Sequence, residues 1–289
     1  MENLLEVHNL SKRYKDFTLS NLSLNVPSGS VVGFIGANGA GKTTVIKSIL
    51  GLIRFDSGEI KILGENPGNA GIHQRLGVVF DKCSFNDWYT VQDIEKIMAV
   101  AYKNFDPVVF DEYLTRFGLS KRKRVKKLSR GMGMKLSLAC ALSHNPELLI
   151  LDEATAGIDP LARDEVLDVL RDFVAQEGHG ILISSHITSD LENIADYIVC
   201  IDVGRMVFSM EKDAITDRAG LAQCREAEFD NLVQSNFFTP GMMRFMQNKY
   251  GISVLVPDRF EFARNFPKIT LECVNIDQYL QIILKGELR

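Results

Sequence analysis

Residues 36–43 read Gly-Ala-Asn-Gly-Ala-Gly-Lys-Thr and fit the pattern G-x-x-x-x-G-K-[ST]. Glycines let a backbone curl until successive N–H groups point inward, where they can bind phosphate oxygens. A helix that begins near Lys42 adds the positive end of its dipole at the same place. In this pattern the lysine reaches the β- and γ-phosphates and the hydroxyl of Thr43 ligates Mg²⁺. The run therefore predicts a site for a nucleoside triphosphate and its metal ion.

A second candidate site is the carboxylate pair Asp152 and Glu153, which follows the apolar run 148–151. A buried strand that ends in an aspartate beside a phosphate-binding loop can give Mg²⁺ a further contact, directly or through water. Glu153 would then be placed to polarise an attacking water. Such a pair alone often marks only the place where a strand meets solvent. Together with the glycine-rich loop, it indicates hydrolysis of the nucleotide.

Residues 128–132, Leu-Ser-Arg-Gly-Met, precede a helix with regularly spaced apolar residues. One interpretation is that Ser129 is an ordinary N-cap with Gly131 in the first turn. The other is a second phosphate-binding helix start, which would contact a nucleotide held by a partner subunit. The motif by itself leaves both interpretations open.

The elements that must hold these residues alternate between apolar strands and helical patterns. Uninterrupted apolar runs, typical of buried parallel strands, are separated by stretches with apolar residues at helical spacing. This order predicts an α/β fold, with a P-loop core and a mainly parallel sheet. The runs span residues 31–35, 148–151, 181–183 and 197–201.

Near the N-terminus the pattern changes to an alternation of apolar and polar residues. Leu22, Leu24 and Val26 show it, as do residues 5–7 and 60–62. Alternation with a period of two predicts half-exposed antiparallel strands. We therefore expect an antiparallel β subdomain beside the main sheet.

A helical subdomain is expected as an insertion at about residues 82–140. Thr90 and Asp93 have the spacing of a capping box. Asp106 and Pro107 supply an N-cap and a first-turn proline for a second helix. This subdomain would carry the Leu-Ser-Arg-Gly-Met motif.

Beyond about residue 216 the pattern weakens. Helical stretches surround one short strand at 252–256, and a last helix covers about 276–284. We therefore expect residues 1–216 to form a nucleotide-binding domain and residues 217–289 to form a small α/β C-terminal extension.

Composition narrows the functional classes. The 289 residues include 33 Lys plus Arg and 37 Asp plus Glu, which gives a formal net charge of −4. A slightly acidic chain has no overall positive charge that would favour binding to nucleic acid. The basic run 121–127 could bind nucleic acid or could be a solvated helix end. Five scattered cysteines, none in a Cys-x-x-Cys pair, argue against a zinc site or disulfide framework. The start is unlike a signal peptide and no apolar run approaches about 18 residues, so we expect a cytoplasmic chain without its own membrane span.

Taken together, six segments resemble those of the ATP-binding cassette (ABC) ATPases, in the order that the family shows. The resemblance covers roughly residues 1–215, and its intervals leave no room for the long coiled coil of chromosome-maintenance relatives. The segments are an adenine-stacking aromatic (Tyr14), Walker A (36–43), the LSGGQ signature (128–132), Walker B (148–153), the D-loop (156–159) and the strand end with the switch histidine (184–186).

This resemblance implies that two subunits enclose two ATP molecules, each between one P-loop and the signature of the other subunit. It implies ATP and Mg²⁺ as cofactors, Glu153 as the general base, and Lys42 and His186 as further catalytic groups. The remaining implied assignments are nucleotide binding by Tyr14, Gly36, Ala37, Asn38, Gly39, Ala40, Gly41, Lys42, Thr43 and Thr44; the trans signature contact by Ser129, Arg130, Gly131 and Met132; the D-loop contact by Asp159; and metal binding by Thr43, Asp81 and Asp152.

Two positions depart from the family pattern. Asp81 stands where the Q-loop glutamine is expected. Aspartate can still face Mg²⁺ through water, although it is shorter and charged; it could equally be a solvated loop residue. In the signature, Arg130 and Met132 replace a glycine and a glutamine. Because Ser129 and Gly131 are retained, we expect the trans site to be retained as well.

The function implied is an ATP-hydrolysing subunit that energises transport through a separate transmembrane permease, at the cytoplasmic face of a membrane. Its implied partners are a second ABC ATPase subunit, identical or different, and the permease, with no nucleic acid expected. Phe85, Trp88 and Tyr89 could anchor the permease or belong to the core of the helical subdomain. The alternative is a soluble ABC-type ATPase that acts on a ribosome or nucleic acid. A cassette that binds ATP without hydrolysing it is a third possibility, against which Glu153 and His186 argue.

Overall fold

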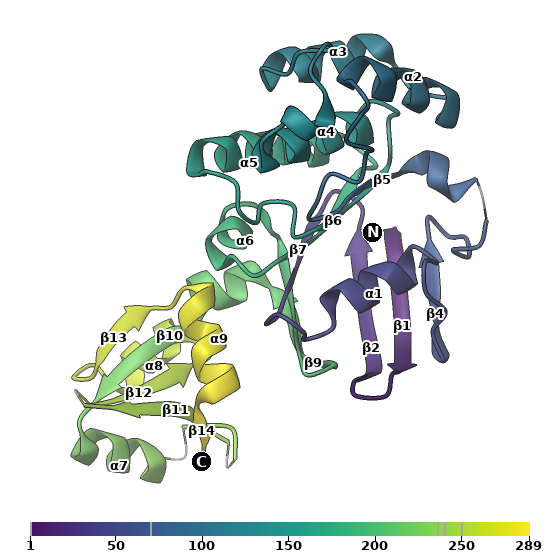
Figure 1. Ribbon diagram of the computed structural model, residues 1–289. Helices are drawn as coiled ribbons and strands as arrows, with labels where there is room; N and C mark the ends of the chain where they lie inside the picture. Colours follow the sequence, from purple (N-terminus) through teal and green to yellow (C-terminus); the bar gives the residue numbers. More distant parts are fainter. Residues whose placement is uncertain (1, 70, 236, 240, 250) are drawn as a thin grey trace. The chain divides into compact units, whose positions relative to one another are not determined.

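The computed structural model describes residues 2–69, 71–235, 237–239, 241–249 and 251–289. The chain divides into two compact units, Met1–Ser209 and Met210–Arg289 (Figure 1). The division falls inside strand β9, a few residues before the boundary expected from the sequence. None of the helices in these described ranges is both long and apolar enough to cross a bilayer.

The first unit is built on a six-stranded sheet with the order β5-β6-β7-β3-β8-β9. The neighbours from β5 to β8 are all parallel, and β3, β6 and β7 are buried along their whole length. Burial on both faces explains why these strands have uninterrupted apolar sequences. The predicted, mainly parallel α/β sheet is confirmed. Its strands are Val31–Ile35 (β3), Leu76–Val79 (β5), Leu148–Asp152 (β6), Gly180–Ser185 (β7), Tyr197–Asp202 (β8) and Arg205–Glu211 (β9).

A separate antiparallel sheet, with the order β2-β1-β4, packs beside the central one. Its alternating buried residues join those of helix α1 and strand β3 in one core, which includes Leu5, Leu24 and Ile46. The expected antiparallel subdomain is therefore present. The elements are Asn3–Arg13 (β1), Thr18–Pro27 (β2), Ser57–Ile62 (β4) and Lys42–Ile49 (α1).

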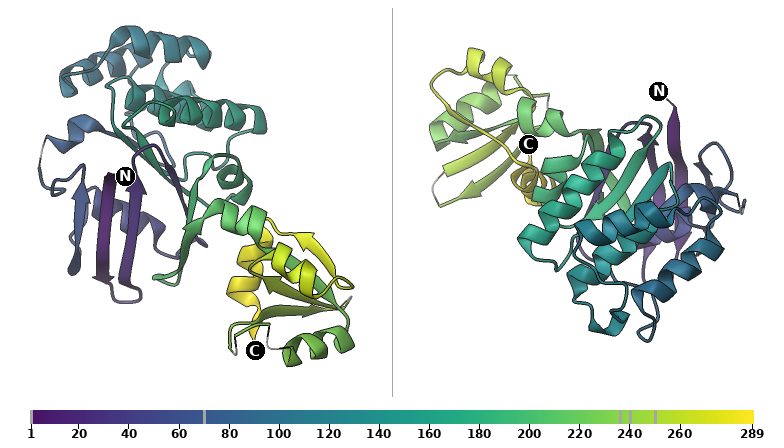
Figure 2. Two further views of the ribbon diagram at one scale, coloured as in Figure 1. Left: turned by 180° about the vertical axis from the view of Figure 1, so that it is seen from behind. Right: turned by 90° about the horizontal axis from the view of Figure 1, so that it is seen from above.

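Three helices, α2, α3 and α4, pack on one another and form the helical subdomain of this unit (Figures 1 and 2). The predicted capping box of Thr90 and Asp93 is formed, and the Asp106 side chain caps α3, as expected. Helices α5 and α6 pack against β7. The helices are Val91–Ala101 (α2), Pro107–Arg116 (α3), Arg130–Leu142 (α4), Pro160–Val174 (α5) and Thr188–Ile194 (α6), with 3₁₀ turns at Ile72–Arg75 and Val125–Lys127.

The second unit contains a five-stranded antiparallel sheet with the order β13-β10-β12-β11-β14. Helices α7 and α8 contribute Phe229 and Phe262 to one apolar cluster, whereas Ile282 of α9 joins Leu221 and Leu255 in another. The elements are a π-helical turn at Ala214–Arg218 (η3), Gly220–Cys224 (β10), Glu226–Gln234 (α7), Arg244–Asn248 (β11), Gly251–Val256 (β12), Arg259–Asn265 (α8), Thr270–Cys273 (β13), Ile276–Lys285 (α9) and Glu287–Leu288 (β14).

Three local expectations are wrong. The second unit holds a sheet rather than one strand among helices; the missed strands are short, and β13 and β14 are largely exposed. Helix α1 ends at Ile49, because Gly51 with φ +68° turns the chain before Ile53. The basic run 121–127 does not end an α-helix: only Val125–Lys127 form a 3₁₀ turn, whose Val125 N–H donates to the Tyr89 carbonyl over 2.9 Å.

Candidate active site: a phosphate loop facing two carboxylates

The glycine-rich loop connects buried strand β3 to helix α1, which begins at Lys42. Gly41 caps the helix with φ +115°, a conformation that side chains other than glycine rarely adopt. Gly36 packs so closely on strand β8 that an added Cβ would lie 2.4 Å from the carbonyl oxygen of Ile201. The loop is therefore held in place by β8 while the N–H groups of the first helical turn remain available to an anion.

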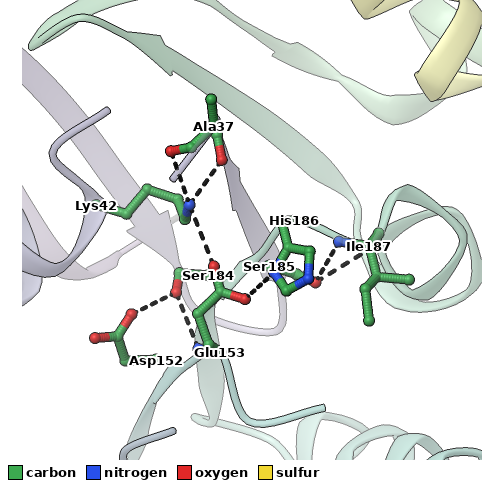
Figure 3. Close-up of polar contacts among 9 residues, drawn as sticks. Ala37, Lys42, Asp152, Glu153, Ser184, Ser185, His186 and Ile187 are labelled. Carbon is green, nitrogen blue, oxygen red and sulfur yellow. Dashed lines mark hydrogen bonds and ion pairs between the residues drawn. The ribbon is translucent and has the colours of Figure 1, made fainter. Parts of the chain in front are cut away.

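The carboxylate of Asp152 is held at the end of strand β6 by the neighbouring strand. Asp152 is 5% exposed and is the register partner of Ser184 on β7. The Ser184 hydroxyl donates a hydrogen bond to Asp152 Oδ1 (2.7 Å) and accepts one from the N–H of Glu153 (3.1 Å; Figure 3). One serine thus orients both residues of the carboxylate pair.

Glu153 lies between two groups that the sequence separates widely. Its Oε1 is 3.2 Å from Lys42 Nζ, and its Oε2 contacts His186 Nδ1 within hydrogen-bond distance (Figure 3). The lysine also donates to the carbonyl of Gly36 over 2.7 Å. Glu153 has φ +55°, an uncommon conformation for a residue with a side chain, and such strain concentrates at functional sites.

A cavity of about 640 Å³ opens beside these groups, and most of the predicted catalytic and metal-binding residues line it. Thr43, Asp81 and Asp152 line it together, which places a hydroxyl and two carboxylates around one space. Mg²⁺ in nucleotide sites prefers one or two carboxylates, substrate phosphates and water, so this donor set fits the ion. The full lining is Asn38, Thr43, Lys47, Phe80, Asp81, Lys82, Ser84, Arg130, Asp152, Glu153, Ala156 and His186.

A second cavity, of about 280 Å³, follows the phosphate loop itself. Its aromatic wall is Phe17, whose ring would lie 2.7 Å from a Cβ on Gly41. Tyr14 is 43% exposed and lines neither cavity, although its ring centroid is 6.4 Å from that of Phe17. The sequence reasoning missed Phe17; only its position three residues after Tyr14, just before β2, could have suggested it. Its cavity is lined by Phe17, Ala37, Asn38, Gly39, Gly41, Lys42, Thr43, Thr44 and Glu153.

Comparison with known proteins agrees with this geometry. Residues 19–156 match the family described as ABC transporter. The bacitracin transport ATP-binding protein BcrA of Bacillus licheniformis is 36% identical over 227 residues, 75% of this chain and 73% of BcrA. The chain belongs to the ABC transporter ATP-binding proteins. The ABC transporter ATP-binding protein YtrB of Bacillus subtilis is 31% identical over 283 residues, 95% of this chain and 96% of YtrB.

Among solved structures, CbiO1 of Clostridium perfringens, described as part of the ABC transporter complex CbiONQ, is 25% identical with a TM-score of 0.64. The similarity covers 82% of this chain and 96% of CbiO1. The fold is thus that of ABC nucleotide-binding subunits, and the chain is an ATPase of this family, as the sequence predicted.

The segment expected to be the ABC signature, residues 128–132, leads into the start of helix α4. Ser129 is its N-cap and accepts from the Met132 N–H over 3.3 Å, as the simpler of the two interpretations expects. Of these five residues only Arg130 lines the 640 Å³ cavity. Its guanidinium packs on the D-loop, where an added Cβ on Gly157 would lie 2.5 Å from Nη1.

Helices α5 and α6 follow the loops beside the cavity, and α5 has a side-chain cap. Asp159 of the D-loop caps α5 by accepting from the Ala162 N–H over 3.0 Å, and it lines neither cavity. Asp190 of α6 is buried. Burial raises the pKa of the Asp190 carboxyl, while Thr155 and Arg163 act in the opposite direction. Arg163 lies 3.7 Å away, so α5 and α6 are joined by a partly compensated buried charge.

Proposed function

We propose that this chain is the ATP-hydrolysing subunit of a membrane transporter whose transmembrane part is a separate chain. The observation that carries the proposal is the position of Glu153 between Lys42 and His186, in one cavity with Asp152 and Thr43. The transporter names of relatives that span most of the chain support the coupling to transport rather than to a ribosome or nucleic acid.

In the proposed reaction, the phosphates of ATP bind to the loop N–H groups, and Lys42 transfers from Glu153 to the β- and γ-phosphates. Glu153 is then free to accept a proton from the attacking water. His186 holds the water and the γ-phosphate in line, so that positioning and charge stabilisation provide most of the catalysis. Mg²⁺ would be held by Thr43 and Asp152, with Asp81 in place of the Q-loop glutamine, and would neutralise phosphate charge.

The active unit in this proposal is a dimer, with an identical or a different second ABC subunit. Ser129, Gly131 and Met132 start a helix but do not line their own subunit's cavity, which supports a role toward the nucleotide of a partner. Arg130 would bring an additional positive charge to the interface, and Asp159 would lie beside it in the D-loop. Tyr14 and Phe17 are both candidates for stacking on adenine.

The surface proposed for the permease lies in the helical subdomain. Trp88 is 66% exposed and Tyr89 is 42% exposed, whereas Phe85 is half-buried. Exposed aromatic side chains are favoured as anchors in the centres of interfaces. Lys126 Nζ lies 3.9 Å from the centroid of the Trp88 ring, in a cation–π contact. Docking there would hold the chain at the cytoplasmic face of a membrane.

The test is to isolate the Glu153→Gln variant from cells in the presence of ATP and Mg²⁺ and to identify what remains bound. We expect one integral-membrane protein, recovered in amounts that fall when ATP is replaced by ADP. The matched control is Trp88→Ala in the same background, which should lose the membrane protein while retaining ATP binding. Nuclease-sensitive association with ribosomes, in place of a membrane protein, would refute the proposal.

A further inference from the structure

The C-terminal unit contains a cavity of its own, of about 440 Å³. This volume is within the range of about 300–1,000 Å³ that is usual for small-molecule sites. Strands β11 and β12, helix α9 and the turn η3 all contribute to its walls. The walls are mostly apolar: Met210, Ala214, Ala219, Phe237, Phe238, Met242, Leu255, Pro257 and Ile283.

The other lining residues are Arg244, Tyr279 and Thr239, and they supply all the polar side chains of the cavity. Arg244 is half-buried, and its Nη1 donates to the carbonyl of Ile283 over 2.8 Å. Guanidinium has five N–H donors, so most of them remain for another partner. In the described part of the chain, no carboxylate forms an ion pair with Arg244.

Tyr279 places a hydroxyl close to this positive charge. The phenol is half-buried, and its hydroxyl donates to the sulfur of Met210 over 3.6 Å. Burial raises the pKa of Tyr279, and the charge of Arg244 acts in the opposite direction. A half-buried cation without a counter-ion carries a desolvation cost, which an anion bound beside it would offset.

We propose that this cavity binds a small amphipathic carboxylate from solution, with an alkyl or aryl body against the apolar walls and its head group on Arg244. The Tyr279 hydroxyl would exchange its bond to the Met210 sulfur for one to the same head group. Charge complementarity decides the class of ligand: the walls select an apolar body, and the uncompensated guanidinium selects an anionic end. A nucleotide is a poor fit, because its several phosphates would meet a single cation.

The test is calorimetric titration of the full chain with hexanoate, octanoate and decanoate, and with 1-octanol as the uncharged counterpart of octanoate. We expect affinity to rise about fourfold for each added methylene, because each buries further apolar surface. Octanoate should bind at least roughly tenfold more tightly than 1-octanol, as expected for a charge-assisted hydrogen bond. Arg244→Met should remove this preference and leave 1-octanol binding unchanged.

Two further variants show whether a loss of octanoate binding is specific to Arg244 or follows from removing any arginine of the unit. Arg264→Met on α8 removes an exposed arginine that does not line the cavity, and should bind octanoate like the wild type. Arg244→Lys keeps the charge and should retain most of the affinity for octanoate. This result would show that the loss in Arg244→Met comes from the missing charge and not from a folding defect. Equal losses in Arg244→Met and Arg264→Met, or no octanoate binding by a folded wild type, would overturn the proposal. Binding only to phosphatidylglycerol vesicles would overturn it in favour of a membrane lipid.

Discussion

The Ser184 hydroxyl donates to Asp152 Oδ1 over 2.7 Å, across the paired strands β6 and β7. The same oxygen accepts from the backbone N–H of Glu153, so Ser184, which does not line the cavity, binds the Asp152 carboxylate and the Glu153 backbone. Groups that orient the ligands of a metal are as much a part of its site as the ligands themselves. We therefore expect Ser184 to act as a positioning residue of the proposed ATPase site.

Replacing Ser184 by alanine should reduce ATP turnover by about 10- to 100-fold and raise the Mg²⁺ concentration needed for half-maximal activity. The reason is that Asp152 loses the bond that sets its rotamer. Turnover is measured as a function of Mg²⁺ concentration, because a smaller amount of folded protein would lower the rate without shifting the Mg²⁺ dependence. Ser185→Ala is the matched control, since the Ser185 hydroxyl accepts from the Ile187 N–H instead. Equal Mg²⁺ dependence in the two variants would contradict the assignment.

Glu153→Gln should lower the rate of ATP hydrolysis by at least about 10²-fold, the usual contribution of a general base. It should also tighten ATP binding, because Glu153 no longer competes with the phosphates for Lys42, 3.2 Å away. Phosphate release and nucleotide titration measure the two effects separately. Undiminished turnover would refute the base assignment; unchanged or weaker ATP affinity would show that the ion pair does not oppose binding.

Gly36→Ala should displace the phosphate loop. The new methyl group would lie 2.4 Å from the backbone oxygen of Ile201, which cannot rotate away as a side-chain end could. Overpacking of this kind destabilises a protein by about 1–3 kcal/mol and should weaken ATP binding. Chemical unfolding and nucleotide titration check both. Gly68→Ala, at an exposed glycine with nothing within 4 Å of the added Cβ, should change neither quantity.

The stability of the fold should depend on pH through Glu147. The Arg75 guanidinium hydrogen-bonds to Glu147 and holds the pKa of that carboxyl below its usual range. The pair therefore stabilises the fold above the unfolded pKa of about 4.3, and this contribution disappears as the pH falls through the lower, folded pKa. Because both side chains are about 40% exposed, Glu147→Gln should lower the free energy of unfolding at pH 7 by no more than about 1 kcal/mol.

Urea unfolding of both proteins at pH 7 and in acid measures this difference, which should shrink below about pH 4.3. Glu177→Gln is the control, since Glu177 is exposed and forms no ion pair among the described residues. A Glu147→Gln effect that is as large in acid as at neutral pH would contradict the pairing.

Much of the first unit follows from local sequence. The buried strands are apolar throughout, the glycine-rich loop and Walker B carry specific spacing, and the caps at Thr90 and Asp106 form as predicted. The C-terminal sheet was not predictable in the same way. Strand β14 spans two residues and β13 spans four, too few to show any periodicity, and both depend on pairing partners distant in the sequence.

The contacts within the site were harder to predict than its members. Spacing identifies Asp152 and Glu153, but only the register of β6 with β7 reveals that Ser184 binds to both. The packing of Arg130 on Gly157 joins the start of helix α4 to the loop before α5. Such pairings depend on tertiary structure, which no local pattern contains.

One carboxylate, that of Glu153, contacts both Lys42 and His186. A ligand that draws Lys42 away and a partner that draws His186 away therefore act on the same group. By thermodynamic linkage, each must change the affinity for the other by the same factor. A subunit that contacts His186 would thus change the affinity for nucleotide, and bound nucleotide would change the affinity for that subunit.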